Sequence, residues 1–188
     1  MMNILTDVLP EEIKINGKAY PIETDFRTWI KFSQLAFSGK ADAVSFAEMI
    51  ALVVKELPTD INATIAALLE FYSCHNTQKS DTNKSKQNRM FDFDSDAAYI
   101  YAAFMQQYGI DLTRANLHWW TFKSLFDSIS EETHFGKIMQ YRCTDISQIK
   151  DKEMKKFYQK MKCVYALPDN RSDEEKERDF AEGLSGLF

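Results

Sequence analysis

Apolar residues recur at intervals of three and four positions through much of the first half of this chain. This spacing places them on one face of a helix, so it predicts amphipathic α-helices. We predict three such helices, over about 25–37, 45–57 and 59–73. Ser45-Phe46-Ala47-Glu48 has the spacing of a capping box and should open the second helix. Pro58 ends that helix, and Thr59 or Asp60 can cap the third.

The same periodicity predicts four further helices beyond residue 90. Their expected first or capping residues are, in chain order, Asp94, Ser95 or Asp96; Thr113 or Asn116; Ser130; and Ile146. Gly109 is a suitable C-terminal cap for the first of these helices, and the second should end near Ser128. Pro168 should stop the last one after Leu167, because proline cannot continue a helix.

The N-terminal pattern differs from the rest and predicts a β-hairpin over residues 13–21. Ile13-Lys14-Ile15 and Lys18-Ala19-Tyr20 flank Asn16-Gly17, and Asn-Gly is the preferred pair for a two-residue hairpin turn. Such a hairpin is marginal alone and must lie on the helices or pair with another chain. The expected fold is therefore mainly α, a compact domain of about six to seven helices with a small N-terminal β-hairpin.

Polar composition divides the chain. Residues 76–89 contain no large apolar side chain, which predicts a mobile loop between N-terminal helices (25–75) and aromatic-rich helices (90–168). The basic excess of this loop could alternatively contact an acidic partner. We predict one helical domain over 1–168, followed by an acidic tail over 169–188, where residues 169–182 carry seven acidic and three basic side chains.

Composition narrows the classes of function. No apolar run approaches the length of a membrane span, and no secretory signal is visible, so we expect a soluble protein in the cytoplasm where it is made. The net charge of −5 argues against nucleic-acid binding as the main function, although a local basic patch is compatible with it. Cys74, Cys143 and Cys163 are odd in number and widely spaced, so they form neither a disulfide framework nor a paired zinc motif. We expect them to be buried as small hydrophobes in a reducing compartment, in preference to binding a metal.

Candidate catalytic and metal sites are weak. Asp92, Asp94 and Asp96 alternate with Phe91, Phe93 and Ser95, but the Gly and Glu of a calcium loop are missing. We interpret these carboxylates as caps of the following helix, with the phenylalanines entering the core. The histidines, His75, His118 and His134, form no metal or nucleophile motif; a satisfied, partly buried ring is the interpretation for His118. We expect no catalytic, cofactor or metal residues, and a protein that is not an enzyme.

Adjacent tryptophans give the one candidate contact site. Neighbouring residues in a helix lie about 100° apart, so Trp119 and Trp120 cannot share one narrow stripe. Trp119 is in phase with the expected core face, whereas Trp120 falls with Leu117 and Ser124. Trp120 either packs against a second helix or is an exposed anchor. We predict Trp120 and Leu117 as partner-binding residues.

The order of these motifs resembles a known family. An Asn16-Gly17 hairpin, Phe71-Tyr72 at the end of an early helix, an acidic Phe-Asp loop and the aromatic segments of Phe91 to Arg142 follow one another. This order is similar to that of the bacteriophage Gp15 family, small proteins from the tail-morphogenesis region of long-tailed phages and prophages of Gram-positive bacteria. The resemblance covers about Ile13 to Pro168 and is strongest from Phe91 to Arg142.

The resemblance implies a tail-assembly chaperone in the host bacterial cytoplasm. Such a chaperone keeps the tape-measure protein, or another tail protein, soluble until the tail tube forms. The alternative is a structural component of the tail, and a third interpretation is a small enzyme or a regulatory nucleic-acid-binding protein. Self-association stays open, and neither a membrane nor a cofactor is expected.

Overall fold

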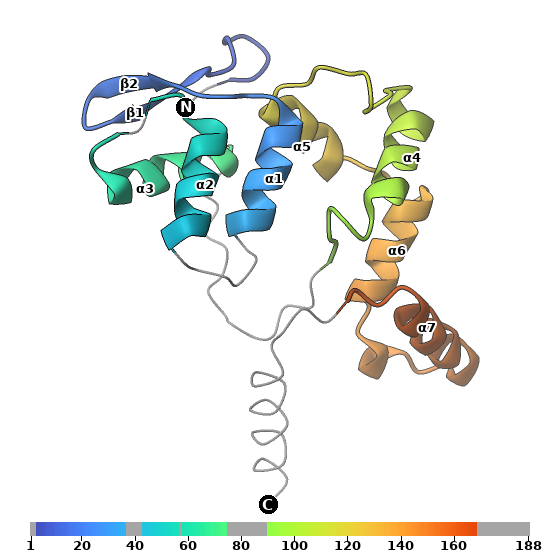
Figure 1. The fold of residues 1–188 in the computed structure, drawn as a ribbon. Coiled ribbons are helices and arrows are strands. Elements are labelled where there is room, and N and C mark those ends of the chain that lie inside the picture. The colour runs from blue at the N-terminus through green and yellow to red at the C-terminus, as the bar shows by residue number, and fades with distance from the viewer. Residues whose placement is uncertain (1–2, 37–42, 57, 75–89, 169–188) are drawn as a thin grey trace, which may run out of the picture.

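The computed structural model describes residues 3–36, 43–56, 58–74 and 90–168. Within them, seven α-helices, a short 3-10 helix and a two-stranded hairpin follow one another (Figure 1). In chain order these elements are β1 (Glu12–Ile15), β2 (Lys18–Pro21), α1 (Phe26–Ala36), α2 (Ala43–Val53), α3 (Ile61–Tyr72), α4 (Ala97–Tyr108), α5 (Trp119–Asp127), α6 (His134–Cys143), η1 (Ile146–Gln148) and α7 (Lys152–Val164). The mainly α fold with a small N-terminal hairpin is confirmed.

The hairpin has the predicted turn. Asn16 and Gly17 both have positive φ, 49° and 82°, as the tightest hairpin turn requires, and β1 pairs antiparallel with β2. Ile13 and Ile15 are buried, and the Asn16 side chain donates a hydrogen bond to Asp60 at the start of α3. The hairpin therefore lies on the helices of its own chain.

Most of the predicted helices exist, and several start elsewhere. Asp60 caps α3 by accepting from the Ala63 N–H, and Gly109 ends α4 with φ of 66°, both as predicted. Ser45 is not the cap of α2, because that helix already begins at Ala43. Ser130 does not cap α6 either: the side chain of Thr133 accepts from the Gly136 N–H and does so instead.

Two other helical predictions differ more. The helix expected from Thr113 or Asn116 begins only at Trp119. Leu117 is still extended, since its carbonyl accepts from the Phe26 N–H and the Trp119 N–H donates to the Thr24 carbonyl. This short antiparallel contact ties the first turns of α1 and α5 together. The helix expected from Ile146 to Leu167 is two elements, η1 and α7, each with its own aspartate cap, Asp145 and Asp151.

An aromatic core joins the two halves of the chain. Trp29 of α1 is fully buried and packs its ring 4.6 Å from Phe71 and 6.4 Å from Trp119. Phe122 of α5 stacks at 5.1 Å on Phe104 of α4, so the same cluster continues into the second half. Burying large rings stabilises a fold through area and through offset ring contacts. As Figure 1 shows, the hairpin and α1–α3 lie on one side of the molecule, and α4, α6 and α7 follow one another on the other.

Two predicted segments, the loop over 76–89 and the tail over 169–188, lie outside the described residues. Among the helices that the structure describes, none combines the length and the apolar character needed to cross a membrane.

Candidate functional site

The structure decides between the two interpretations of Trp120. Its side chain is 5% exposed, and its indole N–H donates a 2.9 Å hydrogen bond to the Phe71 carbonyl at the end of α3. The exposed-anchor alternative is therefore wrong, and packing against a second helix is confirmed. Trp119, Phe122 and Phe126 are buried on the core face as expected. Burial gives no support to a partner contact of Trp120.

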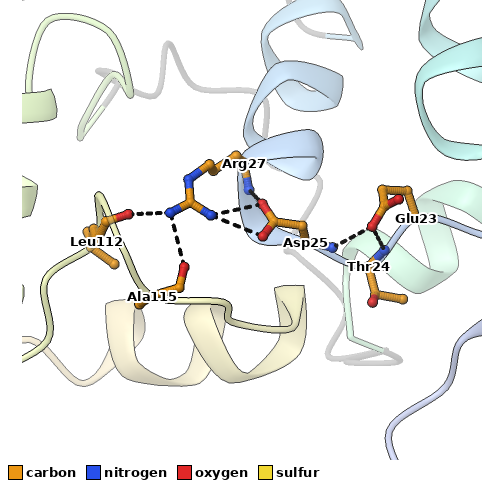
Figure 2. Close-up of polar contacts among 6 residues, drawn as sticks. All are labelled: Glu23, Thr24, Asp25, Arg27, Leu112 and Ala115. Atoms are coloured by element: carbon orange, nitrogen blue, oxygen red, sulfur yellow. Dashed lines mark hydrogen bonds and ion pairs between the residues drawn. The ribbon is translucent and has the colours of Figure 1, made fainter.

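Leu117 is half-buried and packs against the core. Its segment is held by Arg27, whose guanidinium donates to the carbonyls of Leu112 and Ala115 at 2.6 and 3.0 Å and pairs with Asp25 (Figure 2). These bonds fix the turn before α5 against the start of α1. A partner contact by Leu117 or Trp120 stays a prediction. In the structure both side chains pack against the core of their own chain.

His118 caps α5 in place of the expected Thr113 or Asn116. Its Nδ1 accepts from the Trp120 N–H at 3.1 Å, and a backbone N–H can only donate. The ring must therefore carry its proton on Nε2, which donates to the Pro10 carbonyl at 3.0 Å. Burial lowers the pKa of His118, against a smaller opposing effect of the Pro10 hydrogen bond. The ring is satisfied and partly buried, as predicted, although it precedes the helix.

A buried ion pair joins the acidic loop to α6. Asp96 is 1% exposed and receives two hydrogen bonds from Arg142, at 2.6 and 2.9 Å, and a third from the Asp92 N–H at 2.9 Å. Arg142, 8% exposed, also donates to the carbonyls of Met90 and Tyr165. The Arg142 guanidinium therefore bonds both to the residues that precede α4 and to the residue that follows α7. The role of this ion pair is structural, because both groups are enclosed and satisfied.

The predicted capping role of the three aspartates needs correction. Asp96 makes no side-chain cap to α4, since both its oxygens are engaged by Arg142 and Asp92. Asp92 instead accepts from the N–H groups of Asp94 and Ser95, and Asp94 accepts from Gln34 of α1. Phe91 and Phe93 pack against the core as expected. Within the described residues, no group of three His, Cys, Asp or Glu side chains is placed to hold a metal ion.

The three cysteines are free thiols. Burial raises the pKa of Cys74 to about 11, so this thiol is protonated at neutral pH and chemically quiet. Cys143 and Cys163 are exposed, at the end of α6 and on α7, so the prediction that the cysteines are buried is wrong for these two.

The surface that stands out is α7. This helix repeats apolar residues at helical spacing, yet none of its residues is buried within the described structure. Met154, Phe157 and Val164 are 49%, 44% and 60% exposed. We call these three side chains the α7 face. In Figure 1 the helix lies at the edge of the molecule beside α6.

One side of α7 rests on α6, and Phe157 of the α7 face lies at the edge of this contact. Tyr141 of α6 contacts the rings of Phe157, Tyr158 and Tyr165 at 5.9 to 6.0 Å between centroids. Asp151 caps the helix by accepting from the Met154 N–H at 2.8 Å. The helix is thus capped and anchored on α6 through its aromatic side chains, while Met154, Val164 and part of Phe157 stay exposed. The sequence pattern placed these residues on a helix but gave no sign that their face is uncovered.

These features define a small, mainly α-helical protein with an aromatic core and one amphipathic helix exposed among its described residues. Its family follows from comparison: the family model described as "Bacteriophage Gp15 protein" matches residues 5–167. The chain belongs to this family, and the resemblance of the motifs is confirmed. Neither the curated proteins nor the solved structures give a match.

Proposed function

We propose that this phage-related protein acts in tail morphogenesis as an assembly chaperone that binds the tape-measure protein in the host cytoplasm. Family membership supports a phage role. The observation that carries the finer proposal is α7, a capped amphipathic helix with no buried residue in the described structure. The proposal includes no catalytic step and no cofactor.

The physical argument concerns aggregation. A tape-measure protein is expected to be a long amphipathic helix whose apolar stripe is exposed before the tail tube surrounds it. A folded protein that offers a second apolar stripe can cover part of it, since apolar burial is the main driving force for association. Met154 suits such a contact because methionine adapts to varied partner surfaces. The aromatic core would keep the rest of the chaperone rigid meanwhile.

Co-expression tests the proposal. Tape-measure fragments from the same phage should remain in the soluble fraction and co-purify with this protein, and should sediment without it. An unrelated helical protein of similar size, expressed at the same level, is the control. If no fragment is retained although both proteins are soluble, chaperoning is wrong.

Mass spectrometry of purified phage particles separates a chaperone from a structural component. A chaperone leaves before the particle is complete, so its peptides should be absent while those of the tube and the tape measure are present. Stoichiometric amounts in the particle would contradict the proposal and establish the structural role instead.

A further inference from the structure

We infer that the α7 face and the lysines beside it bind an amphipathic helix that carries acidic residues next to its apolar positions. This inference rests on the proposed function, since it names the chemistry of the tape-measure segment that would dock. It assigns the contact to α7, and to neither Trp120 nor Leu117.

The net positive charge of α7 indicates an acidic partner. α7 contains five lysines, Lys152, Lys155, Lys156, Lys160 and Lys162, against one acid, Glu153. Its net charge is therefore +4 in a chain of −5, which leaves −9 for all other residues. Such a concentration of one sign on one helix selects for the opposite sign on the partner.

The lysines are placed to border the α7 face. Lys160 is three residues after Phe157 and four before Val164, so it lies within one turn of both. Lys155 and Lys162 lie on the other side, three residues before and four after Tyr158, where α7 packs on Tyr141 and where Lys162 is close to Asp145. Glu153, four residues before Phe157, is paired with Lys156 at 3.6 Å. An apolar stripe on a helix with a net charge of +4 fits a helix whose own stripe lies between acidic borders, as in helix-in-groove and coiled-coil recognition.

Other occupants fit less well. If α7 of a second copy docked on α7, two helices that each carry a net charge of +4 would face each other and repel. The end of the chain itself fits less well, because residues 169–179, which follow Pro168 directly, contain no apolar side chain. An anionic lipid surface would attract α7 and repel the −9 of the remaining chain.

Binding of overlapping tape-measure fragments to the full chain tests the inference. Phe157→Ser and Val164→Ser should each raise the Kd of acid-flanked fragments about tenfold, because they remove apolar contact area. Lys160→Glu should raise it by a similar factor at low salt and by less at high salt, because ions screen exposed charges. Met105→Ser, at another exposed apolar residue on α4, and Lys31→Glu, with the same charge change on α1, are the matched controls and should stay within twofold.

The outcomes separate the two proposals. If no fragment binds, the proposed function fails; if fragments bind the α7 variants as tightly as the parent, only the docking surface is wrong. Equal binding of basic-flanked fragments would also overturn it. A dimer in light scattering that Phe157→Ser dissociates would assign α7 to a second copy of the chain. A tenfold gain in fragment affinity in the double variant Leu184→Ser with Leu187→Ser would assign α7 to the chain's own end. Binding of phosphatidylglycerol vesicles that Lys160→Glu abolishes, with fragment binding unchanged, would assign α7 to a membrane.

Discussion

At the scale of single residues, the pair of Asp96 and Arg142 shows how one side chain can connect distant segments. Arg142 bonds to the loop before α4, to Asp96 at its start and to the residue after α7. A buried pair of this kind adds little over an apolar replacement, but breaking it leaves a charge enclosed without compensation. Removing Arg142 alone should therefore destabilise the protein, whereas replacing both residues by apolar ones should not.

Arg142→Ala should lower the free energy of unfolding by about 3–5 kcal/mol, because Asp96 then stays buried and unpaired. The single variant Arg142→Met should be destabilised for the same reason. The double variant with Asp96→Leu should recover most of the stability lost, because no charge is then left buried. Arg114→Ala removes an exposed arginine paired with Asp111 and should change stability by less than about 0.5 kcal/mol. Urea unfolding measures all of them; an Arg142→Ala variant as stable as Arg114→Ala would contradict the role of the pair.

His118 predicts a pH dependence with a definite sign. Its pKa in the folded protein lies below the ordinary value of 6.5, so the unfolded chain binds the proton more readily. The neutral His118 ring therefore contributes to the free energy of unfolding in full above about pH 6.5, and this contribution is lost as the pH falls below that value. Protonation also removes the Nδ1 acceptor of the Trp120 N–H. His118→Asn keeps a cap and does not titrate, so it should lose less stability than the parent between pH 7.5 and 5.5. Equal losses in urea titrations would refute this.

The tryptophan pair should behave as two core residues. Trp119 and Trp120 both donate their indole N–H to carbonyls at the end of α3, Tyr72 and Phe71. Truncating either to alanine should cost about 3–5 kcal/mol, as large core deletions do. Thermal melts of the two variants give the comparison. A Trp120→Ala variant with an unchanged Tm would mean that the ring is not packed in solution.

At the scale of elements, helix starts depend on what the preceding backbone contacts. Residues 117–119 look helical by periodicity, but their backbone groups pair with residues 24–26, and α5 begins only afterwards. Similarly, Ser130 precedes α6 by a turn that packs back onto that helix. The local capping signal is correct at Asp60, whose side chain accepts from the Ala63 N–H in the first turn of α3.

Gly136 gives a test at this scale. A Cβ built there would lie 2.3 Å from the Ser130 carbonyl oxygen, so the turn and α6 can approach only because this side chain is absent. Alanine is intrinsically the better helix former by about 1 kcal/mol, which would stabilise an uncrowded site. Gly136→Ala should instead destabilise by about 1–3 kcal/mol, in the range of overpacking. Denaturant unfolding settles the sign, and a stabilised variant would contradict the close contact.

At the scale of the whole molecule, stability should be uneven. α1 and α5 contribute fully buried rings to one core, whereas α7 rests on α6 through an edge of aromatic contacts. Amide hydrogens of α7 should therefore exchange faster than those of α1, α4 and α5 in native-state measurements, since few apolar contacts oppose local opening. Protection of α7 equal to that of α1 in the isolated chain would show that something covers it.

The sequence by itself determined the classes of element and much of their order. The Asn16-Gly17 turn, the caps at Asp60 and Gly109, and the buried faces of Trp119 and Phe122 all follow from local rules, because backbone conformation and periodicity are properties of neighbouring residues. The motif order also led correctly to the Gp15 family.

Only the tertiary structure decided which polar and apolar faces are covered. Arg142 shares the helical phase of Phe135 and Ile138, a signal that could have placed it in the core, but its partner 46 residues earlier is not a local property. Trp120 is buried because the end of α3 offers a carbonyl and a ring beside it. The α7 face stays largely exposed because the described elements cover it only in part, at Phe157, which Tyr141 of α6 contacts. Burial depends on segments far apart in the chain, and periodicity within one helix cannot supply it.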